Sequence, residues 1–347
     1  MTSRERVLTA FDHREPDRVP VWCGASAEFM AKVQGELGLG EEAWLLRVGD
    51  DFRRVRAKYS GPEFDLSPGA DSRTVFGVER HGMGYGQPMA HPLAGATLAD
   101  IEAYPWPDPA WTDASEVRAD ALQWNGEYAI LGGDWSPFFH DAIDLMGMDG
   151  LYFAMYDAPE VVDALMGRMT DYYLASSRRI FDAGADAMDV FFIGNDFGSQ
   201  TGPLLSEGLF RRFVLPHLRR YIELGHAYGL RVMLHCCGGI RPLIPAMIEA
   251  GLDGVHAVQP SCVGMDLRAL KLEFGSRILF NGAIDSHHVL INGTPQSVRE
   301  ATREVLAIMK PGGGYVAGAS HDSILEETPV ANVLAMFDAV HEFGAYA

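Results

Sequence analysis

The sequence contains few cysteines and no long apolar run, and these two shortages exclude several classes of protein. Only four cysteines occur in 347 residues, too few for a disulfide framework, so we expect free thiols. No stretch approaches ~20 consecutive apolar residues, so no transmembrane helix is expected. The segment 1–20 carries charges throughout and has no apolar core, which argues against a signal peptide. A reducing, cytoplasmic location is therefore predicted.

Positive charge is also scarce. The chain has 28 Lys and Arg against 47 Asp and Glu, which gives a formal net charge of -19. Such a field repels polyanions, so neither nucleic acid nor an anionic membrane surface is an expected partner. The phosphate-loop pattern G-x-x-x-x-G-K-[ST] and the hydrolase pattern G-x-S-x-G are both missing. The expected partner is therefore a small-molecule substrate.

What the sequence does contain is a regular alternation of short apolar runs and longer helical patterns. Strands are predicted at 19–24, 128–134, 187–196, 231–237, 254–259, 278–285 and 314–320, with an eighth near 51–55. Helices are predicted between them, and Gly184, Gly229 and Gly251 are each expected to end one in a left-handed conformation. This alternation is typical of βαβ units. We predict a single α/β domain over 1–347, an eight-stranded (β/α)₈ TIM barrel.

One stretch, 59–125, interrupts the alternation because it is rich in glycine, proline and tryptophan. We interpret it as an irregular excursion over the barrel mouth that acts as a lid. The alternative is a long surface connection with no part in the site.

Polar side chains gather where the predicted strands end. The carboxyl ends of the strands carry the reactive groups of a TIM barrel, whereas the strand starts in this chain are apolar. Asp134, Trp135, Asn195 and Gln259 follow three of these strands and are predicted substrate contacts. This asymmetry indicates a catalytic barrel.

The sharpest motif is a His-x-Cys pair at the end of the strand 231–237. Side chains alternate along a strand, so His235 and Cys237 share one face while Cys236 points away. Such a pair can bind Zn²⁺ through nitrogen and sulfur. A third ligand must come from another strand end: His321 is the first candidate, and Cys262 is the second.

Two carboxylates, Asp196 and Asp285, also end strands and are the predicted catalytic acids. Each could orient a zinc-binding histidine, transfer a proton or cap the following helix. His256 lies inside a strand and could face either the barrel interior or the helices. His287 and His288 are expected to be exposed on the way into a helix.

Several segments together resemble the uroporphyrinogen decarboxylase superfamily. The opening Ser-Arg-Glu-Arg-Val-Leu-Thr-Ala-Phe, followed by Glu-Pro-Asp-Arg-Val-Pro, is similar to its usual start. The strand end Asn-Gly-Ala-Ile-Asp285 and the segment from Gly312 through Thr328 to Asn332 are similar to its later barrel units. The resemblance implies a (β/α)₈ barrel. The superfamily also contains zinc-dependent methylcobamide:thiol methyltransferases.

Two features separate the branches of this superfamily. True decarboxylases carry Arg-Gln-Ala-Gly-Arg near the first strand to grip carboxylates, whereas 19–24 has no arginine after Arg18. The methyltransferase branch has His-x-Cys at the end of a mid-barrel strand, which His235 and Cys237 match, and a later cysteine whose position falls on His321. The resemblance therefore implies zinc and a corrinoid carried by a partner protein.

Three reactions stay open at this point. The first is zinc-dependent methyl transfer between a corrinoid and a thiol or other small acceptor. The second is decarboxylation of a small or tetrapyrrole carboxylate, with Asp196 or Asp285 as the proton donor. The third is another zinc-assisted reaction, such as demethylation of a small compound. The oligomeric state is also open, with a homodimer as one option.

Overall fold

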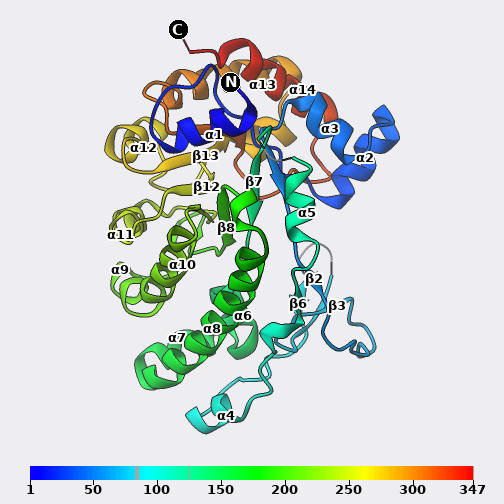
Figure 1. The fold of residues 1–347 in the computed structure, drawn as a ribbon. Coiled ribbons are helices and arrows are strands. Elements are labelled where there is room, and N and C mark those ends of the chain that lie inside the picture. The colour runs from blue at the N-terminus through cyan, green and yellow to red at the C-terminus, as the bar shows by residue number, and fades with distance from the viewer. Residues whose placement is uncertain (83–85, 125, 347) are drawn as a thin grey trace.

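A parallel, curled sheet with helices around it forms the centre of the protein (Figure 1). The computed structural model describes residues 1–82, 86–124 and 126–346. The seven strands, in spatial order, are β1 (Phe52–Arg54), β7 (Ala129–Gly132), β8 (Val190–Gly194), β11 (Arg231–His235), β12 (Gly254–Val258), β13 (Leu279–Ile284) and β14 (Tyr315–Ala319). The architecture is α/β and resembles a TIM barrel.

Helices surround the sheet and pack on one another (Figure 1). They include α2 (Ala27–Leu37), α3 (Glu41–Val48), α5 (Val117–Leu122), α6 (Phe138–Met146), α7 (Met148–Asp157), α8 (Pro159–Gly184), α9 (Glu207–Leu209), α10 (Leu215–Ala227), α11 (Ile244–Glu249), α12 (Leu267–Phe274), α13 (Pro295–Met309) and α14 (Val330–Phe343). Within the described residues, no helix is long and apolar enough to cross a membrane.

The inside of the curled sheet has its own apolar core. Helix α1 (Ser3–Phe11) contributes Val7, Ala10 and Phe11 to it, and strands contribute residues such as Leu131 and Val190. Because α1 contacts both β7 and β14, it covers the amino ends of the strands. The carboxyl ends are left to form the site.

The segment 19–24 lies between β14 and β1, where the sequence predicts the first strand. Val21 forms a parallel bridge with Ala317, and the Asp51 N–H donates to the Val21 carbonyl at 3.0 Å. The segment is extended, but it makes isolated bridges instead of a regular strand. Pro20 has no N–H, and side-chain carboxylates bind the N–H groups of Val21 and Cys23, so a backbone ladder does not form.

Asp51 is the main polar link between this segment and β1. Its side chain is fully buried, and its oxygens accept hydrogen bonds from Arg6 at 2.7 Å and from Arg18 at 2.7 and 2.9 Å. It also accepts the Val21 N–H at 2.7 Å. One carboxylate therefore joins α1, the opening segment and β1.

We expect Asp51→Asn to lower the free energy of unfolding by about 3–5 kcal/mol, because it removes the anion that Arg18 binds and one of the two anions that Arg6 binds. Urea denaturation measures this change. The matched control is Asp338→Asn, which breaks an exposed pair with Arg47 and should cost about 0–1 kcal/mol. Equal losses in the two variants would contradict this role for Asp51.

The predicted helix ends are confirmed at two glycines and wrong at the third. Gly229 and Gly251 have positive φ values of 75° and 91°. Gly184, however, is the last residue of α8 with φ -166°, and a 3₁₀ turn (Ala185–Ala187) follows directly. A Cβ there would lie 3.0 Å from the Arg118 Cα, so close packing explains this glycine.

The excursion 59–125 packs along α8 through α4 (Leu98–Ala103) and β6 (Thr112–Asp113). Strand β2 (Lys58–Tyr59) pairs with β6, and β3 (Ser72–Arg73), β4 (Glu79–His81) and β5 (Gln87–Pro88) form a small antiparallel sheet. In Figure 1 the segment extends away from the side of the fold on which both chain termini lie. Residues 83–85 and 125 lie outside the described residues, and the lid role remains a prediction.

Candidate metal centre

Three potential metal ligands meet where β8 and β11 end: Asp196, His235 and Cys237. The His235 Nε2 atom lies 3.4 Å from the Cys237 Sγ atom and 3.4 Å from Asp196 Oδ1. The Cys237 N–H donates to the same Asp196 oxygen at 2.7 Å. Strand pairing explains the meeting, because His235 is in register with Gly194 and Asp196 follows two residues later.

This donor set fits zinc. Ligand atoms on a tetrahedral Zn²⁺ lie ~3.3–3.6 Å apart when the bonds are ~2.0–2.3 Å long, so the separations around His235 Nε2 are suitable. Nitrogen, sulfur and carboxylate oxygen are also the ligands that zinc takes in proteins. Burial, together with the charge of Asp196, raises the pKa of the Cys237 thiol well above its usual value. Zinc binding must therefore release the thiol proton.

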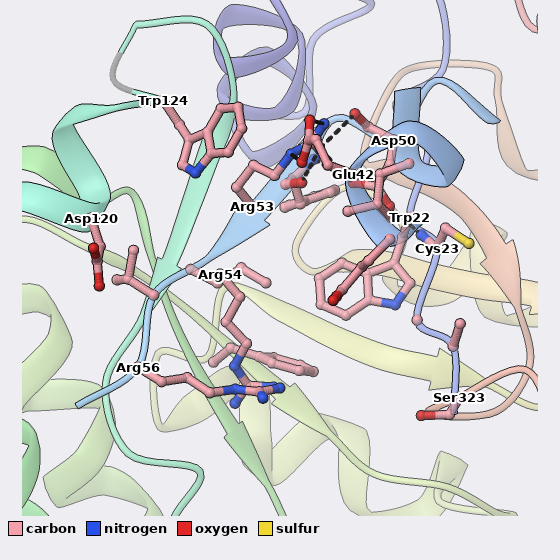
Figure 2. Close-up of a pocket in the computed structure, with 18 of the residues that line it drawn as sticks. Trp22, Cys23, Glu42, Asp50, Arg53, Arg54, Arg56, Asp120, Trp124 and Ser323 are labelled. Atoms are coloured by element: carbon pink, nitrogen blue, oxygen red, sulfur yellow. Dashed lines mark hydrogen bonds and ion pairs between the residues drawn. The ribbon is translucent and has the colours of Figure 1, made fainter. Parts of the chain in front are cut away.

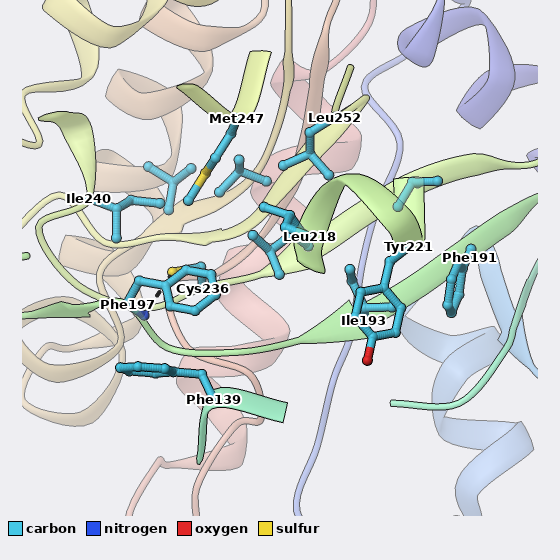
Figure 3. Close-up of a cluster of buried hydrophobic side chains, with 14 of the residues drawn as sticks. Phe139, Phe191, Ile193, Phe197, Leu218, Tyr221, Cys236, Ile240, Met247 and Leu252 are labelled. Carbon is cyan, nitrogen blue, oxygen red and sulfur yellow. Dashed lines mark hydrogen bonds between the residues drawn. The ribbon is translucent and has the colours of Figure 1, made fainter. Parts of the chain in front are cut away.

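Cys236 points to the other side of the strand, as alternation predicts. It is 1% exposed and lies in the apolar layer between sheet and helices, beside Phe197 and Phe139 (Figure 3). The Phe197 N–H donates to the Cys236 Sγ atom at 3.2 Å. Cys236 is thus held in the core, and Cys237 alone of the two contacts His235.

The turn after Cys237 requires glycine. Gly238 has φ 91°, and a Cβ on it would lie 2.5 Å from the Gly198 carbonyl carbon. The Gly238 N–H donates to the Gln259 side chain at 3.0 Å. The turn is therefore clamped between the loops that follow β8 and β12, which fixes the position of Cys237.

The second ring nitrogen of His235 faces a second cluster, formed with His256 and Asp322. His235 Nδ1 lies 3.0 Å from His256 Nδ1 and 3.9 Å from Asp322 Oδ1. His256 is fully buried, and this burial lowers its pKa well below the usual value, so the ring is neutral. A partner on Nδ1 orients a histidine whose Nε2 binds metal. His256 and Asp322 thus support His235 from behind.

Neither His256 nor Asp322 is singled out as a site residue by the sequence. The ladder between β12 and β13 is irregular between Val255 and Val258, so alternation cannot show which way His256 faces. The usable signal is the pairing of β11 with β12, which places His235 directly beside His256.

His321 and Cys262, the two candidates for a third ligand, lie outside both clusters in the described part of the chain. The His321 Nδ1 atom lies 3.0 Å from the Ser323 carbonyl oxygen within its own loop. His321 nevertheless immediately precedes Asp322, a member of the second cluster, in the loop after β14. The Cys262 thiol donates to the Gln259 side chain at 3.3 Å. The role of His321 as a ligand remains a prediction.

The two predicted catalytic acids occupy different surroundings. Asp196 joins the zinc-type cluster, and its other oxygen lies 3.6 Å from the His140 Nε2 atom. Burial lowers the pKa of His140, a residue that the sequence analysis missed because it lies inside α6 and not at a strand end. Asp285 instead accepts the His288 N–H at 2.7 Å and caps the turn 286–291. Its carboxylate belongs to neither cluster in the described residues.

Two of the four predicted substrate contacts hold the surrounding loops. Asn195 is buried; its amide oxygen accepts the Phe139 N–H at 2.9 Å, and its amide nitrogen donates to the Ser136 carbonyl at 3.0 Å. Gln259 binds the Gly238 N–H, as described above. Contact of either residue with substrate remains a prediction.

The other two predicted substrate contacts, Asp134 and Trp135, line a cavity. Burial raises the pKa of Asp134, whose carboxylate accepts a 2.6 Å hydrogen bond from the Ser176 hydroxyl. The Trp135 ring stacks on the His235 ring with centroids 5.6 Å apart and an interplanar angle of 30°. Trp135 is therefore part of the wall beside the candidate metal ligands.

A large cavity of about 990 Å³ opens beside this wall (Figure 2). Its lining includes Trp22, Arg54, Trp135, Phe192, Asp322 and Ser323. Asp322, a member of the second cluster, lines this cavity, and Trp135 separates it from the His235 ring. A cavity of this size accepts a small organic ligand.

Comparison with known proteins places the chain in a family. The model of the uroporphyrinogen decarboxylase (URO-D) family matches residues 82–343. A uroporphyrinogen decarboxylase of Alkalilimnicola ehrlichii is 28% identical over 360 residues, covering 97% of this chain and 93% of that protein. One of Pseudomonas aeruginosa is 27% identical over 264 residues, covering 72% and 70%.

Methyltransferases are also among the similar proteins. The methylcobamide:CoM methyltransferase MtbA of Methanosarcina acetivorans is 22% identical over 231 residues, covering 65% of this chain and 62% of that protein. A solved structure of a methyltransferase from Methanosarcina mazei matches with a TM-score of 0.72 and 20% identity, covering 99% of both chains, which supports the fold. All of these relatives are enzymes. The chain belongs to the uroporphyrinogen decarboxylase family.

Proposed function

We propose that this protein is a zinc-dependent methyltransferase that moves a methyl group between a corrinoid, carried by a partner protein, and a thiol or other small acceptor. The observation that carries the proposal is the meeting of His235 Nε2, Cys237 Sγ and Asp196 Oδ1 at the carboxyl ends of two strands. The relative named as a methylcobamide:CoM methyltransferase supports the same reading.

The residues around this cluster have distinct roles in the proposed reaction. His235 and Cys237 would hold the zinc, with Asp196 or His321 completing the set. A zinc ion bound there lowers the pKa of a coordinated thiol, which is ~8.5 in free cysteine, so that the thiol reacts as a thiolate at neutral pH. His256 fixes the orientation of the His235 ring from behind.

The proton that leaves the acceptor thiol also needs a destination. Asp196 Oδ2 and His140 Nε2 lie 3.6 Å apart, and both side chains are partly exposed. The lowered pKa of His140 leaves its ring unprotonated at neutral pH, and the neighbouring Asp196 carboxylate would stabilise the ring once it takes up a proton. We assign proton removal to His140, with Asp196 positioning its ring.

The excursion 59–125 has a place in the same proposal, as a lid over the mouth of one domain spanning 1–347. A smaller cavity of about 280 Å³ is lined both by residues of the excursion, such as Tyr59 and Trp111, and by Trp135. Movement of this segment would admit the corrinoid. The proposed setting is the cytoplasm, and the proposed assembly includes a homodimer as one option.

Decarboxylation of a carboxylate substrate is the second candidate. The names of the relatives at 27–28% identity favour it, as does the partly exposed carboxylate of Asp196 beside His235. The segment 19–24 does not favour it, because it contains no arginine and the preceding Arg18 is bound to the buried Asp51.

A direct assay separates the two candidates. Zinc-loaded protein is mixed with methylcobalamin and a panel of small thiols, and loss of the methyl–cobalt bond is followed by absorbance. We expect thiol-dependent demethylation that a chelator removes and added zinc restores. A rate equal to that of thiol and methylcobalamin without protein would contradict methyl transfer to thiols.

A further inference from the structure

Strand β1 and the residues after it carry three arginines that line the large cavity: Arg53, Arg54 and Arg56. Figure 2 shows Arg53 turned toward Glu42 and Asp50, while Arg54 and Arg56 extend to the opposite side. Arg53 binds Glu42 at 2.8 Å and packs over Tyr128. Alternation along the chain explains why Arg54 and Arg56, two residues apart, share a side.

Arg54 and Arg56 lie where the two cavities meet. Both arginines, together with Trp135, line the large cavity of about 990 Å³ and the smaller one of about 280 Å³. The Arg54 guanidinium lies over the rings of Trp135 and Phe192, 5.3 Å from each centroid. Arg54 thus contacts the same Trp135 ring that stacks on His235.

The charge of Arg56 is available to a ligand. Its side chain is exposed and has no hydrogen bond or ion pair within residues 1–82, 86–124 and 126–346. Among the acids of the large cavity, Glu42 and Asp50 face Arg53, and Asp322 faces His235. Glu41 and Asp120 also line it, but neither forms an ion pair with Arg56 in the described chain. Arg54 has interactions within the chain, so Arg56 is the arginine of this pair that brings an unpaired charge in the described residues.

We propose that Arg54 and Arg56 bind the carboxylate of a small organic substrate whose aromatic body lies against Trp135. Guanidinium groups bind carboxylates in a bidentate manner, and aromatic rings favour edge or stacked contact with similar rings. The role of this ligand as methyl donor or acceptor rests on the proposed function. Binding of the ligand can be tested independently, because it requires neither a corrinoid nor a thiol.

Benzoate is a suitable probe, and benzamide is its neutral control of the same shape. Binding to the zinc-loaded protein is followed through the fluorescence of the tryptophans that line the cavity. We expect benzoate to bind at least about tenfold more tightly than benzamide, because charge-assisted hydrogen bonds are the stronger kind. Benzoate affinity should fall as salt is raised.

Variants then locate the anion site. Arg56→Gln and Arg54→Gln should each weaken benzoate binding about tenfold or more, and Arg56→Lys should weaken it less because it keeps the charge. The matched control is Arg303→Gln on α13, an exposed arginine that lines neither cavity and should leave binding unchanged. Zinc content, measured in every variant, should stay at the wild-type level.

Three results would overturn the proposal: no saturable benzoate binding in the millimolar range, equal affinity for benzoate and benzamide, or equal benzoate binding by Arg56→Gln and Arg303→Gln. Tighter binding of benzenesulfonate than of benzoate would overturn the carboxylate assignment. None of these results depends on methyl transfer. Failure here is therefore distinct from failure of the proposed function, which the methylcobalamin assay tests.

Discussion

Changing Cys237 to Ser is expected to lower zinc affinity by more than about a hundredfold and to abolish activity. Removal of partners that only orient a metal ligand typically lowers affinity 10–100-fold, and removal of a ligand should exceed that loss. The Cys237 Sγ atom lies 3.4 Å from His235 Nε2, and no second thiol belongs to this cluster within the described residues. Zinc content after dialysis, measured by atomic absorption, together with the methylcobalamin assay, checks the prediction.

The adjacent cysteine supplies the control. Cys236 has its thiol in the apolar layer behind the strand, where the Phe197 N–H donates to it. Serine keeps an acceptor at this position, so Cys236→Ser should retain zinc and nearly all activity, with at most a modest loss of stability. Circular dichroism of both variants establishes that the fold is retained. Equal zinc loss in the Cys236 and Cys237 variants would show that the strand faces are assigned backwards.

Asp196→Asn is expected to lower activity by about 10–100-fold if the reaction is methyl transfer. The carboxylate binds the Cys237 N–H at 2.7 Å and lies beside His235, so its main effect there is on the position of the ligands. In decarboxylation the same acid would deliver a proton to a carbanion, and its loss should cost nearer ~10²–10⁴-fold with a changed pH profile. The rates of both proteins across pH measure the difference.

Asp285→Asn is the companion variant, because Asp285 also ends a strand but caps the turn that begins at Ser286. An amide oxygen still accepts the His288 N–H, so the loss of activity should be small compared with that of Asp196→Asn. A loss above roughly a thousandfold in Asp196→Asn, with zinc still bound, would contradict simple methyl transfer. A comparable loss in Asp285→Asn would indicate that the reaction takes place at the end of β13, beside Asp285.

The parallel strands were predictable because they are buried on both faces and therefore read as continuous apolar runs. Strand β13 (Leu279–Ile284) is an example, since all six of its residues are buried. The segment 19–24 was harder to predict, because Asp50 and Asp51, buried just before β1, accept the N–H groups of Val21 and Cys23. The use of side-chain carboxylates in place of backbone carbonyls as hydrogen-bond acceptors depends on tertiary contacts. It therefore leaves no pattern in the local sequence.

The candidate site was predictable only where the alternation of side chains along a strand determines which face a residue occupies. His235 and Cys237 follow from the strand period, whereas His256 could not be oriented because its ladder is irregular. Asp196 was found at a strand end, but its contact with His140 arises from a helix that enters from another unit. Arg54 and Arg56 also escaped notice, since their meaning depends on which cavity they line.

The central claim is that zinc is held by His235 and Cys237 and is open to a substrate thiol, and X-ray absorption at the zinc edge tests it most directly. For the zinc-loaded protein, the account predicts one sulfur at ~2.3 Å, with the remaining ligands nitrogen and oxygen. Addition of a substrate thiol should raise the count to two sulfurs, and Cys237→Ser should remove the first. A zinc with no sulfur ligand, or a sulfur count unchanged by every thiol that supports demethylation of methylcobalamin, would contradict the account.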